Sequence, residues 1–145
     1  MRIFDNAQKW DDLLNSFSNN IDKGKRFEDL VSSILENMFA DRNLKFEPTQ
    51  ETHDGSKDFW AVDDERKVWW AECKNYATNI SVKVLSPTLF MAELYDIDFL
   101  LFFSYSRLNS NLLRKIGLYS NKHSKRVFIY DDTSLEHIVC KLFPN

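Results

Sequence analysis

The stretch at 99–103 constrains the fold of this chain more than any other feature of the sequence. Its residues are all apolar, with no polar residue at alternate positions, which is typical of a strand that is covered on both faces. A strand of this kind needs helices on both sides of its sheet. The stretch therefore predicts an α/β fold in which the sheet lies between two helical layers.

The segments on either side of this stretch fit the same arrangement. The clearest helical pattern is at 27–39, where apolar residues recur at i, i+3, i+4 and i+7. In the first half of the chain the patterns predict a short helix in 1–20 capped by Asp5, a long helix capped by Asp22 and running toward Asp41, and a short edge strand at 44–46 before a break at Pro48. A hairpin of strands 58–62 and 67–74 follows, and then a helix opened by Ser86 and Pro87. The strand 99–103 comes next, followed by a helix capped by Ser110 or Asn111, a strand at 126–130, and a last helix capped by Thr133 or Ser134. This order predicts a mixed central sheet with helices on both faces.

Chain length and composition predict one folded unit. The chain has 145 residues, with three Gly and three Pro, which leaves little room for linkers. We expect a single domain over 1–145, with 1–20 as an extra N-terminal helix, either alone or as one domain of a longer protein. No apolar run reaches the ~18 residues that a membrane span requires, and the N-terminus lacks the hydrophobic region of a signal peptide. The expected location is the cytoplasm, without a membrane partner.

Charge and cysteine content narrow the kinds of site that the chain can build. The net charge of −3 argues against a strongly basic nucleic-acid-binding surface. Local basic patches remain, and each one taken alone is better interpreted as solvated charge: Lys23, Lys25 and Arg26; Arg114 and Lys115; Lys122, His123, Lys125 and Arg126. Cys73 and Cys140 are the only cysteines, too few for a disulfide framework or a cysteine zinc site. A metal site must therefore use oxygen ligands.

The predicted hairpin brings acidic and basic residues together. Strand alternation puts Glu72 and Lys74 on one face and sends Cys73 to the core. If the hairpin loop holds an odd number of residues, for instance with Asp63 paired to Lys67, Asp58 falls opposite Glu72, whereas an even loop would separate them. Cross-strand partners have Cβ atoms ~5 Å apart, close enough for two carboxylates to share one divalent ion. This geometry predicts a site for Mg²⁺, for which Mn²⁺ would substitute.

A lysine beside two metal-binding carboxylates indicates phosphodiester hydrolysis. Lys74 can orient or help deprotonate an attacking water and stabilise the charge that grows on a phosphoryl group. The metal lowers the pKa of a bound water and withdraws charge from the phosphate. On the helical wheel Glu28 lies beside the apolar stripe, so its carboxylate can point along the edge of the core. The alternative, that Glu28 is a solvated helix residue, is nearly as good an interpretation.

These residues resemble the successive motifs of a known family. The segments 24–30, 54–58 and 71–74, followed by 99–104 and 126–131, are similar in order and spacing to Mrr-like restriction endonuclease domains of the PD-(D/E)xK superfamily. The resemblance covers nearly the whole chain from Gly24. It implies a restriction-endonuclease-like αβββαβ core and Mg²⁺-dependent DNA cleavage. It also implies metal ligation by Asp58, Glu72 and the carbonyl of Cys73, a catalytic Lys74, and Glu28 supporting the metal directly or through water.

The chain departs from the family pattern at two places. Lys57 stands where the superfamily name has proline, and the helix after the lysine-bearing strand offers Lys83, Ser86 and Thr88 where many relatives carry glutamine or lysine. Several neighbouring residues are weaker candidates for substrate contact. In the predicted turn, His53 is better interpreted as an exposed histidine, and Ser56 and Lys57 as plain turn residues. Trp60, Trp69 and Trp70 can stack on nucleic-acid bases, but at least one of Trp69 and Trp70 should be part of the core.

The sequence therefore predicts a Mg²⁺-dependent DNA endonuclease acting in restriction or anti-phage defence, with Asp58, Glu72, Lys74 and Glu28 as its catalytic residues. A second hypothesis is a catalytically weak nucleic-acid-binding or oligomerisation module of the same fold. A third is a nuclease that cleaves RNA, because the chemistry of the site does not distinguish a ribose with a 2′-hydroxyl from a deoxyribose. A homo-oligomer or attachment to further domains would supply the surface that a chain of 145 residues lacks for reading sequence.

Overall fold

The computed structural model describes residues 20–49, 58–74, 82–104 and 107–142. Within these ranges the side chains at 20–26, 74, 82–87, 133, 139–140 and 142 are not described. The predicted helix within 1–20 and the turn at 52–57 thus lie almost wholly outside the described part of the chain. No helix in the described ranges is both long enough and apolar enough to cross a membrane.

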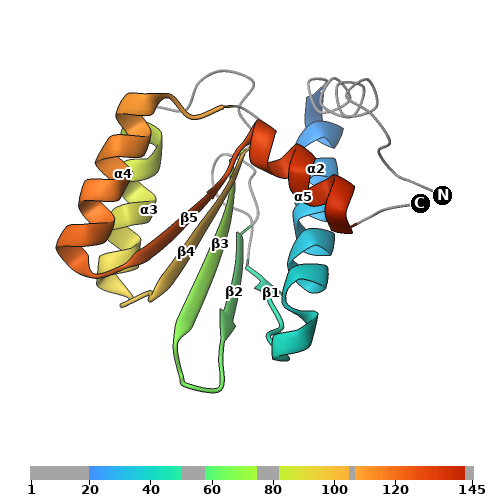
Figure 1. Cartoon of the computed structure of the whole chain (residues 1–145), viewed down its shortest axis with the longest axis horizontal. Helices are drawn as coiled ribbons and strands as arrows, with labels where there is room; N and C mark the ends of the chain where they lie inside the picture. The colour runs from blue at the N-terminus through green and yellow to red at the C-terminus, as the bar shows by residue number, and fades with distance from the viewer. Residues whose placement is uncertain (1–19, 50–57, 75–81, 105–106, 143–145) are drawn as a thin grey trace.

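A five-stranded mixed sheet forms the centre of the molecule (Figure 1). Its strands lie in the order β1 (Glu47–Pro48), β2 (Asp58–Val62), β3 (Val68–Lys74), β4 (Phe99–Ser104) and β5 (Arg126–Tyr130). The first two pairings are antiparallel and the last two are parallel. This mixed sheet belongs to the α/β class that the sequence predicts.

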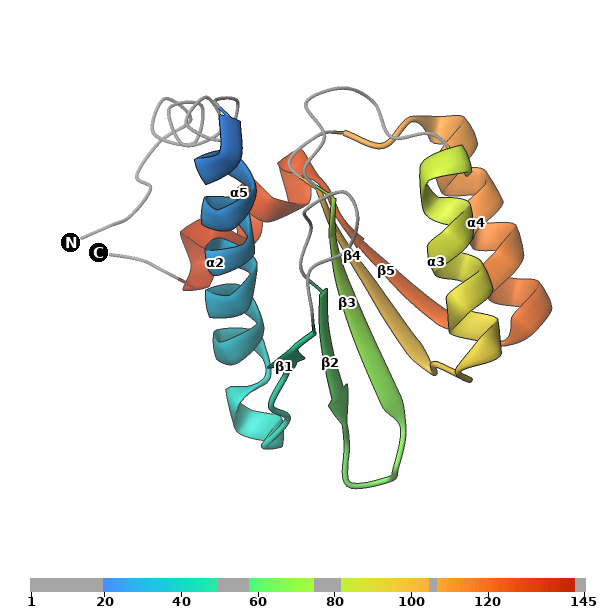
Figure 2. The same cartoon turned by 180° about the vertical axis from the view of Figure 1, so that it is seen from behind.

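Helices cover both faces of this sheet, as Figures 1 and 2 show from opposite sides. On one side lie α2 (Asn20–Met38) and α5 (Asp132–Leu142), and on the other lie α3 (Val82–Leu94) and α4 (Ser110–His123). A short 3-10 helix, η1 (Ala40–Arg42), leads from α2 to β1. The chain crosses from β3 to β4 through α3 and from β4 to β5 through α4, which is how parallel neighbours are connected.

β4 explains why the sheet has two covered faces. Leu101 and Phe103 pack into the core cluster on the α2 side, while Leu100 and Phe102 pack into the cluster on the α3 and α4 side. All four side chains are at most 2% exposed. The continuous apolar stretch at 99–103 thus serves two cores at once, and the prediction of a doubly covered strand is confirmed.

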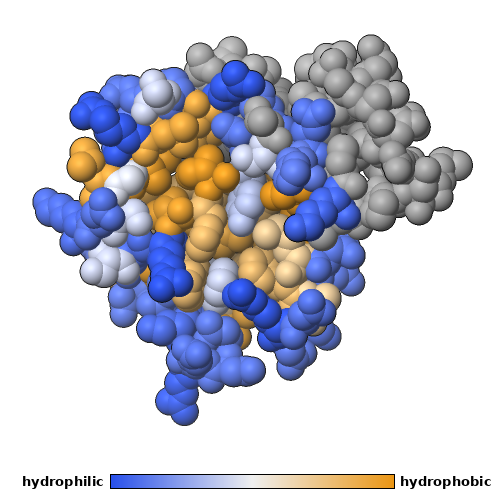
Figure 3. Space-filling view, viewed as in Figure 1, coloured by the Kyte–Doolittle hydropathy of each residue, from blue (hydrophilic) through white to orange (hydrophobic). Residues whose placement is uncertain are grey.

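The surface retains apolar side chains around these layers. Figure 3 shows them gathered on the face that carries α4 and β5, with hydrophilic residues bordering them. Leu113 on α4 and Phe128 on β5 are each 39% exposed. Apolar atoms make up a large share of any protein surface, so this exposure carries no functional conclusion by itself.

Several predicted boundaries are wrong, most of them at the ends of elements, and the edge strand predicted at 44–46 is instead found at 47–48. Asp22 lies inside α2, and Thr133 and Ser134 lie inside α5; Ser86 and Pro87 lie inside α3; Asn109, rather than Ser110 or Asn111, caps α4; and Pro48 is part of β1 rather than its break. Asn109 caps α4 because its Oδ1 accepts the backbone N–H of Leu112 at 2.8 Å. A cap contributes only ~1 kcal/mol, so tertiary packing readily shifts a helix end by a turn.

The hairpin between β2 and β3 has the odd loop on which the site depends. The backbone N–H of Asp63 donates to the carbonyl of Lys67 at 3.0 Å, so these two residues face each other across the loop. The Asp63 side chain holds this turn. Its Oδ1 accepts the backbone N–H groups of Glu65 and Lys67, each at 2.9 Å, and its Oδ2 accepts the indole N–H of Trp69 at 2.9 Å.

Replacing Asp63 should therefore weaken the hairpin in a pH-dependent way. The hydrogen bond from Trp69 is the main cause that lowers the pKa of Asp63, so the carboxylate stabilises the fold above pH ~4 and loses that effect as pH falls through its folded pKa. We expect Asp63→Ala to lower the thermal midpoint by a few degrees at pH 7, and the difference from the unchanged protein to shrink at pH 3. Asp64→Ala, at an exposed neighbour, is the control. A midpoint difference that does not vary with pH would contradict this account.

Candidate active site

Asp58 and Glu72 face each other across the two antiparallel strands of the hairpin. They are direct partners in the β2–β3 register, as the odd loop predicts. Their exposed fractions are 2% and 4%, so both carboxyl groups are taken out of bulk water. Two buried carboxylates in neighbouring positions repel each other when both are ionised. Such a pair is a suitable holder for a hard divalent cation, which prefers oxygen ligands and neutralises this repulsion.

Thr88 connects this pair to α3. Its hydroxyl donates a hydrogen bond to Oε2 of Glu72, and its side chain is 4% exposed. Thr88 was one of three candidates on this helix in the sequence, together with Lys83 and Ser86. The side chains of Lys83 and Ser86 lie outside the described part, and Thr88 is the candidate that the structure brings to the acidic pair. A carboxylate accepts hydrogen bonds only, so the hydroxyl proton of Thr88 is directed at Glu72.

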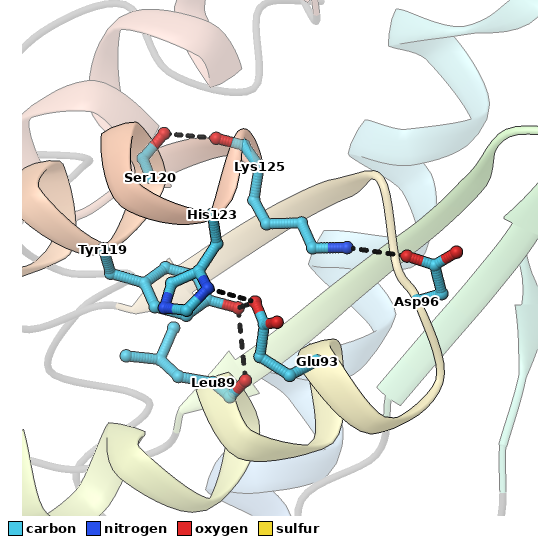
Figure 4. A network of polar contacts seen from close by, with 7 residues as sticks. All are labelled: Leu89, Glu93, Asp96, Tyr119, Ser120, His123 and Lys125. Carbon is cyan, nitrogen blue, oxygen red and sulfur yellow. Dashed lines mark hydrogen bonds and ion pairs between the residues drawn. The ribbon is translucent and has the colours of Figure 1, made fainter.

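A polar network joins α3 to α4 (Figure 4), and its first member on α3, Leu89, is the residue after Thr88. The Tyr119 hydroxyl lies 3.2 Å from the carbonyl of Leu89 and 2.9 Å from Oε1 of Glu93, so both oxygens accept from it. Nδ1 of His123 lies 3.4 Å from the same Glu93 oxygen. Burial raises the pKa of Tyr119, and the hydrogen bond to Glu93 raises it further. The phenol therefore stays protonated and keeps its donor role. Sequence patterns gave no signal for this network, because its members come from two helices whose relative placement depends on the sheet.

Glu28 lies on the buried side of α2. Its side chain is 7% exposed and follows Phe27, which is fully buried in the core on that side of the sheet. The interpretation of Glu28 as a solvated helix residue is therefore wrong. Among the described residues, no three His, Cys, Asp or Glu side chains form a group that could hold a metal ion. A direct or water-mediated role of Glu28 at the metal thus stays a prediction.

The end of β3 carries the other two predicted site residues. Cys73 is fully buried, which confirms that its side chain belongs to the core, while metal binding by its carbonyl stays a prediction. Lys74 is the last residue of β3, two positions after Glu72, and its backbone is the partner of Ser104 on β4. The Lys74 side chain lies outside the described part. His53, Ser56 and Lys57 lie outside it as well.

The tryptophans divide between core and surface. Trp69 is 5% exposed and packs in the core, where its ring stacks on Phe99 with centroids 4.0 Å apart. Trp60 and Trp70 are partners across the hairpin, two positions along the register from Asp58 and Glu72 and therefore on the same face. Trp70 is half-buried against the α3 and α4 core, whereas Trp60 is 42% exposed. An exposed aromatic ring thus lies on the strand face that carries Asp58.

The basic patch around α4 is largely satisfied within the protein. Nζ of Lys125 lies 3.1 Å from Oδ1 of Asp96, and His123 lies beside Glu93 (Figure 4). The guanidinium of Arg126 lies over the ring of Phe99, 5.7 Å from its centroid. The prediction of solvated charge holds for the exposed Lys122, but it is wrong for Lys125, whose side chain is 10% exposed and paired with Asp96. Arg114 and Lys115 are exposed on the same helix.

Comparisons with known proteins agree with this fold. Residues 20–117 match the family Mrr_cat, described as restriction endonuclease. The fold resembles the DNA modification-dependent restriction endonuclease AspBHI, with a TM-score of 0.62 and 12% identity over 95% of this chain and 36% of that one. It also resembles the MspJI restriction endonuclease in complex with a 27-mer oligonucleotide, with a TM-score of 0.60 and 9% identity over 94% of this chain and 31% of that one. A search of curated protein sequences gave no significant match. The chain thus spans about a third of the length of the two solved structures.

Proposed function

Because the chain belongs to the restriction endonuclease family Mrr_cat, a part of the PD-(D/E)xK superfamily, we propose that it is a Mg²⁺-dependent endonuclease that hydrolyses phosphodiester bonds of DNA. The observation that carries this proposal is the buried pair of Asp58 and Glu72 in direct cross-strand register, two residues before Lys74. A buried acidic pair of this kind is costly without a cation. Mn²⁺ substitutes for Mg²⁺, because both ions accept an octahedral set of oxygen ligands.

Each residue of the site has a distinct task in this reaction. Asp58, Glu72 and the carbonyl of Cys73 hold the cation, and Glu28 supports it directly or through water. When bound, the cation lowers the pKa of a coordinated water and withdraws charge from the scissile phosphate. Lys74 orients the attacking water and stabilises the negative charge that develops on the phosphoryl oxygens. We assign catalytic roles to Asp58, Glu72, Lys74 and Glu28 on the chemistry of their side chains.

The choice of DNA as substrate is supported by the relatives and by the exposed ring of Trp60. AspBHI is a DNA modification-dependent endonuclease, and MspJI has been solved with an oligonucleotide. Trp60 lies on the strand face of Asp58 and can stack on a base, an interaction available to any nucleotide. Since the chain spans only about a third of those relatives, we assign the choice of sequence or modification to further domains or to a second copy. The activity then serves restriction or anti-phage defence in the cytoplasm.

A plasmid-cleavage assay with a lysine variant tests the proposal. The unchanged chain should nick or linearise DNA with Mg²⁺ or Mn²⁺ and should be inactive with a chelator. Lys74→Ala should reduce the rate by about 100- to 1000-fold, because it removes one preorganised charge from the reacting phosphate. Lys67→Ala is the matched control, since Lys67 is exposed at the far end of the same hairpin.

Two outcomes would contradict the proposal. One is cleavage that persists in the chelator or in Lys74→Ala at the full rate. The other is a stable DNA complex that is indifferent to metal and shows no cleavage, which would favour a binding module. Single-stranded DNA and RNA of the same sequence, assayed under one metal condition, separate a DNA enzyme from one directed at RNA.

A further inference from the structure

We propose that Thr88 is a positioning residue that fixes the Glu72 carboxylate for the divalent cation. This inference rests on the proposed function, because it concerns a ligand of the same site. It goes beyond that function in assigning a task to α3, a helix that contributes no carboxylate to the metal. The observation that carries it is the hydrogen bond from the Thr88 hydroxyl to Oε2 of Glu72, made between two side chains that are each 4% exposed.

Burial makes this hydrogen bond consequential. In water a glutamate carboxylate rotates freely and is solvated in every orientation, so one hydroxyl would have little effect on it. Glu72 is shielded from bulk water, and a charged acceptor in such a place depends on the donors that the protein supplies. The bond joins residues that lie 16 positions apart on different elements, so it fixes the plane of the carboxylate relative to the sheet and to α3.

The helix that carries Thr88 is itself held in place. Tyr119 on α4 donates to the carbonyl of Leu89, the residue after Thr88, and to Glu93, about one turn farther along α3. Ala92, on the same helix, is buried in the core between α3, α4 and the sheet. Threonine adds rigidity of its own, since its β-branched side chain has few rotamers. Thr88 therefore presents its hydroxyl from a fixed support, which is what a partner of a metal ligand requires.

Three variants give two comparisons that isolate the hydroxyl from the rest of the side chain: the unchanged chain with Thr88→Val, and Thr88→Ser with Thr88→Ala. Thr88→Val replaces the hydroxyl by a methyl group of similar size, and Thr88→Ser keeps the hydroxyl and loses the methyl group. Thr88→Ala differs from Thr88→Ser only in the hydroxyl, so the serine and alanine variants repeat the comparison at smaller volume. If Thr88→Val fails to fold, the second comparison alone decides the question. Circular dichroism establishes that each variant is folded.

The first readout is Mn²⁺ binding to the chain without DNA, measured by isothermal titration calorimetry. Removal of a partner that orients a metal ligand costs about 10- to 100-fold in metal affinity. We expect Thr88→Val and Thr88→Ala to raise the Mn²⁺ dissociation constant by this factor, and Thr88→Ser to stay close to the unchanged chain. The second readout is the Mg²⁺ concentration that gives half-maximal cleavage, which should rise by a similar factor and thus separate weakened metal binding from lost catalytic power.

The outcomes distinguish this inference from the proposed function. If the unchanged chain binds no Mn²⁺, both are overturned. If the unchanged chain binds Mn²⁺ and a folded Thr88→Val or Thr88→Ala binds it equally well, only the positioning role is overturned. If Thr88→Ser loses as much affinity as Thr88→Ala, packing of the methyl group rather than the hydroxyl is responsible, and the positioning role is again overturned.

Discussion

The Asp58→Asn variant is expected to lose Mg²⁺-dependent cleavage while becoming more stable without metal. Asparagine keeps the size of the side chain but removes one negative charge from the buried pair with Glu72. The loss of a charged ligand removes several kcal/mol of cation-assisted stabilisation, so we expect the cleavage rate to fall about 1000-fold. The same change removes repulsion between two carboxylates whose Cβ atoms are ~5 Å apart, which is worth on the order of 1–3 kcal/mol.

Thermal unfolding and plasmid cleavage, measured on the same preparation, check both halves of this expectation. In a chelator the midpoint of Asp58→Asn should lie a few degrees above that of the unchanged chain. Added Mn²⁺ should raise the midpoint of the unchanged chain and leave that of the variant in place, because a bound ligand stabilises only a state that binds it. Asp64→Asn, an exposed substitution in the hairpin loop, should change neither quantity. Cleavage by Asp58→Asn at the full rate would show that the proposed metal site is not needed for the reaction.

Opposite changes in stability and activity are the expected sign of a functional site. A chain selected for stability alone would not bury Asp58 beside Glu72, and the hairpin would be better stabilised by apolar residues there. The rest of the same strands follows that rule. Phe59 and Ala61 of β2, and Ala71 and Cys73 of β3, are all buried on the α2 side. The acidic pair is thus confined to the strand face that the proposed chemistry uses.

The sequence predicted that Glu72 and Lys74 share a face, because strand alternation is a local property. It left the position of Asp58 open between an odd and an even hairpin loop, and the structure has the odd loop. The alternation of Glu72 and Cys73 requires only that 67–74 be a strand, and the odd loop is set by Asp63, which holds its own turn. Strands β2, β3, β4 and β5 were all placed within one residue, β4 from its continuous apolar stretch rather than from alternation. Element ends were less predictable. α3 begins at Val82 and includes Pro87, whose missing N–H leaves the carbonyl of Lys83 without its helical donor.

The contribution of α3 could not be predicted, because it depends on three-dimensional placement. Thr88 reaches Glu72 only because of the rotation of α3 about its axis and its height above the sheet. Tyr119, on α4, helps to fix these two quantities through its hydrogen bonds to Leu89 and Glu93 of α3. The burial of Glu28 was only partly predictable. Its position on the flank of the apolar stripe allowed either a buried or a solvated side chain, and the packing of α2 against the sheet buries it.

Phe103→Ala should produce the largest loss of stability among the changes considered. Phe103 is fully buried, is the partner of Cys73 across β3 and β4, and stacks on Tyr130 with ring centroids 4.8 Å apart. Truncation of a buried phenylalanine removes its transfer free energy and leaves a cavity, which together cost about 3–5 kcal/mol. A domain with a total stability of about 5–15 kcal/mol would then be close to unfolding at physiological temperature.

Urea unfolding at 25 °C gives the free energy for this variant and for its control, Phe128→Ala. Phe128 is on the neighbouring strand β5 and is 39% exposed, so its truncation should cost much less than that of Phe103. Equal losses for the two variants would contradict the placement of β4 between two cores. The Phe103→Ala protein that remains folded at low temperature should still bind Mn²⁺, because Phe103 belongs to the core on the α2 side, whereas Glu72 and its Thr88 donor lie on the α3 side.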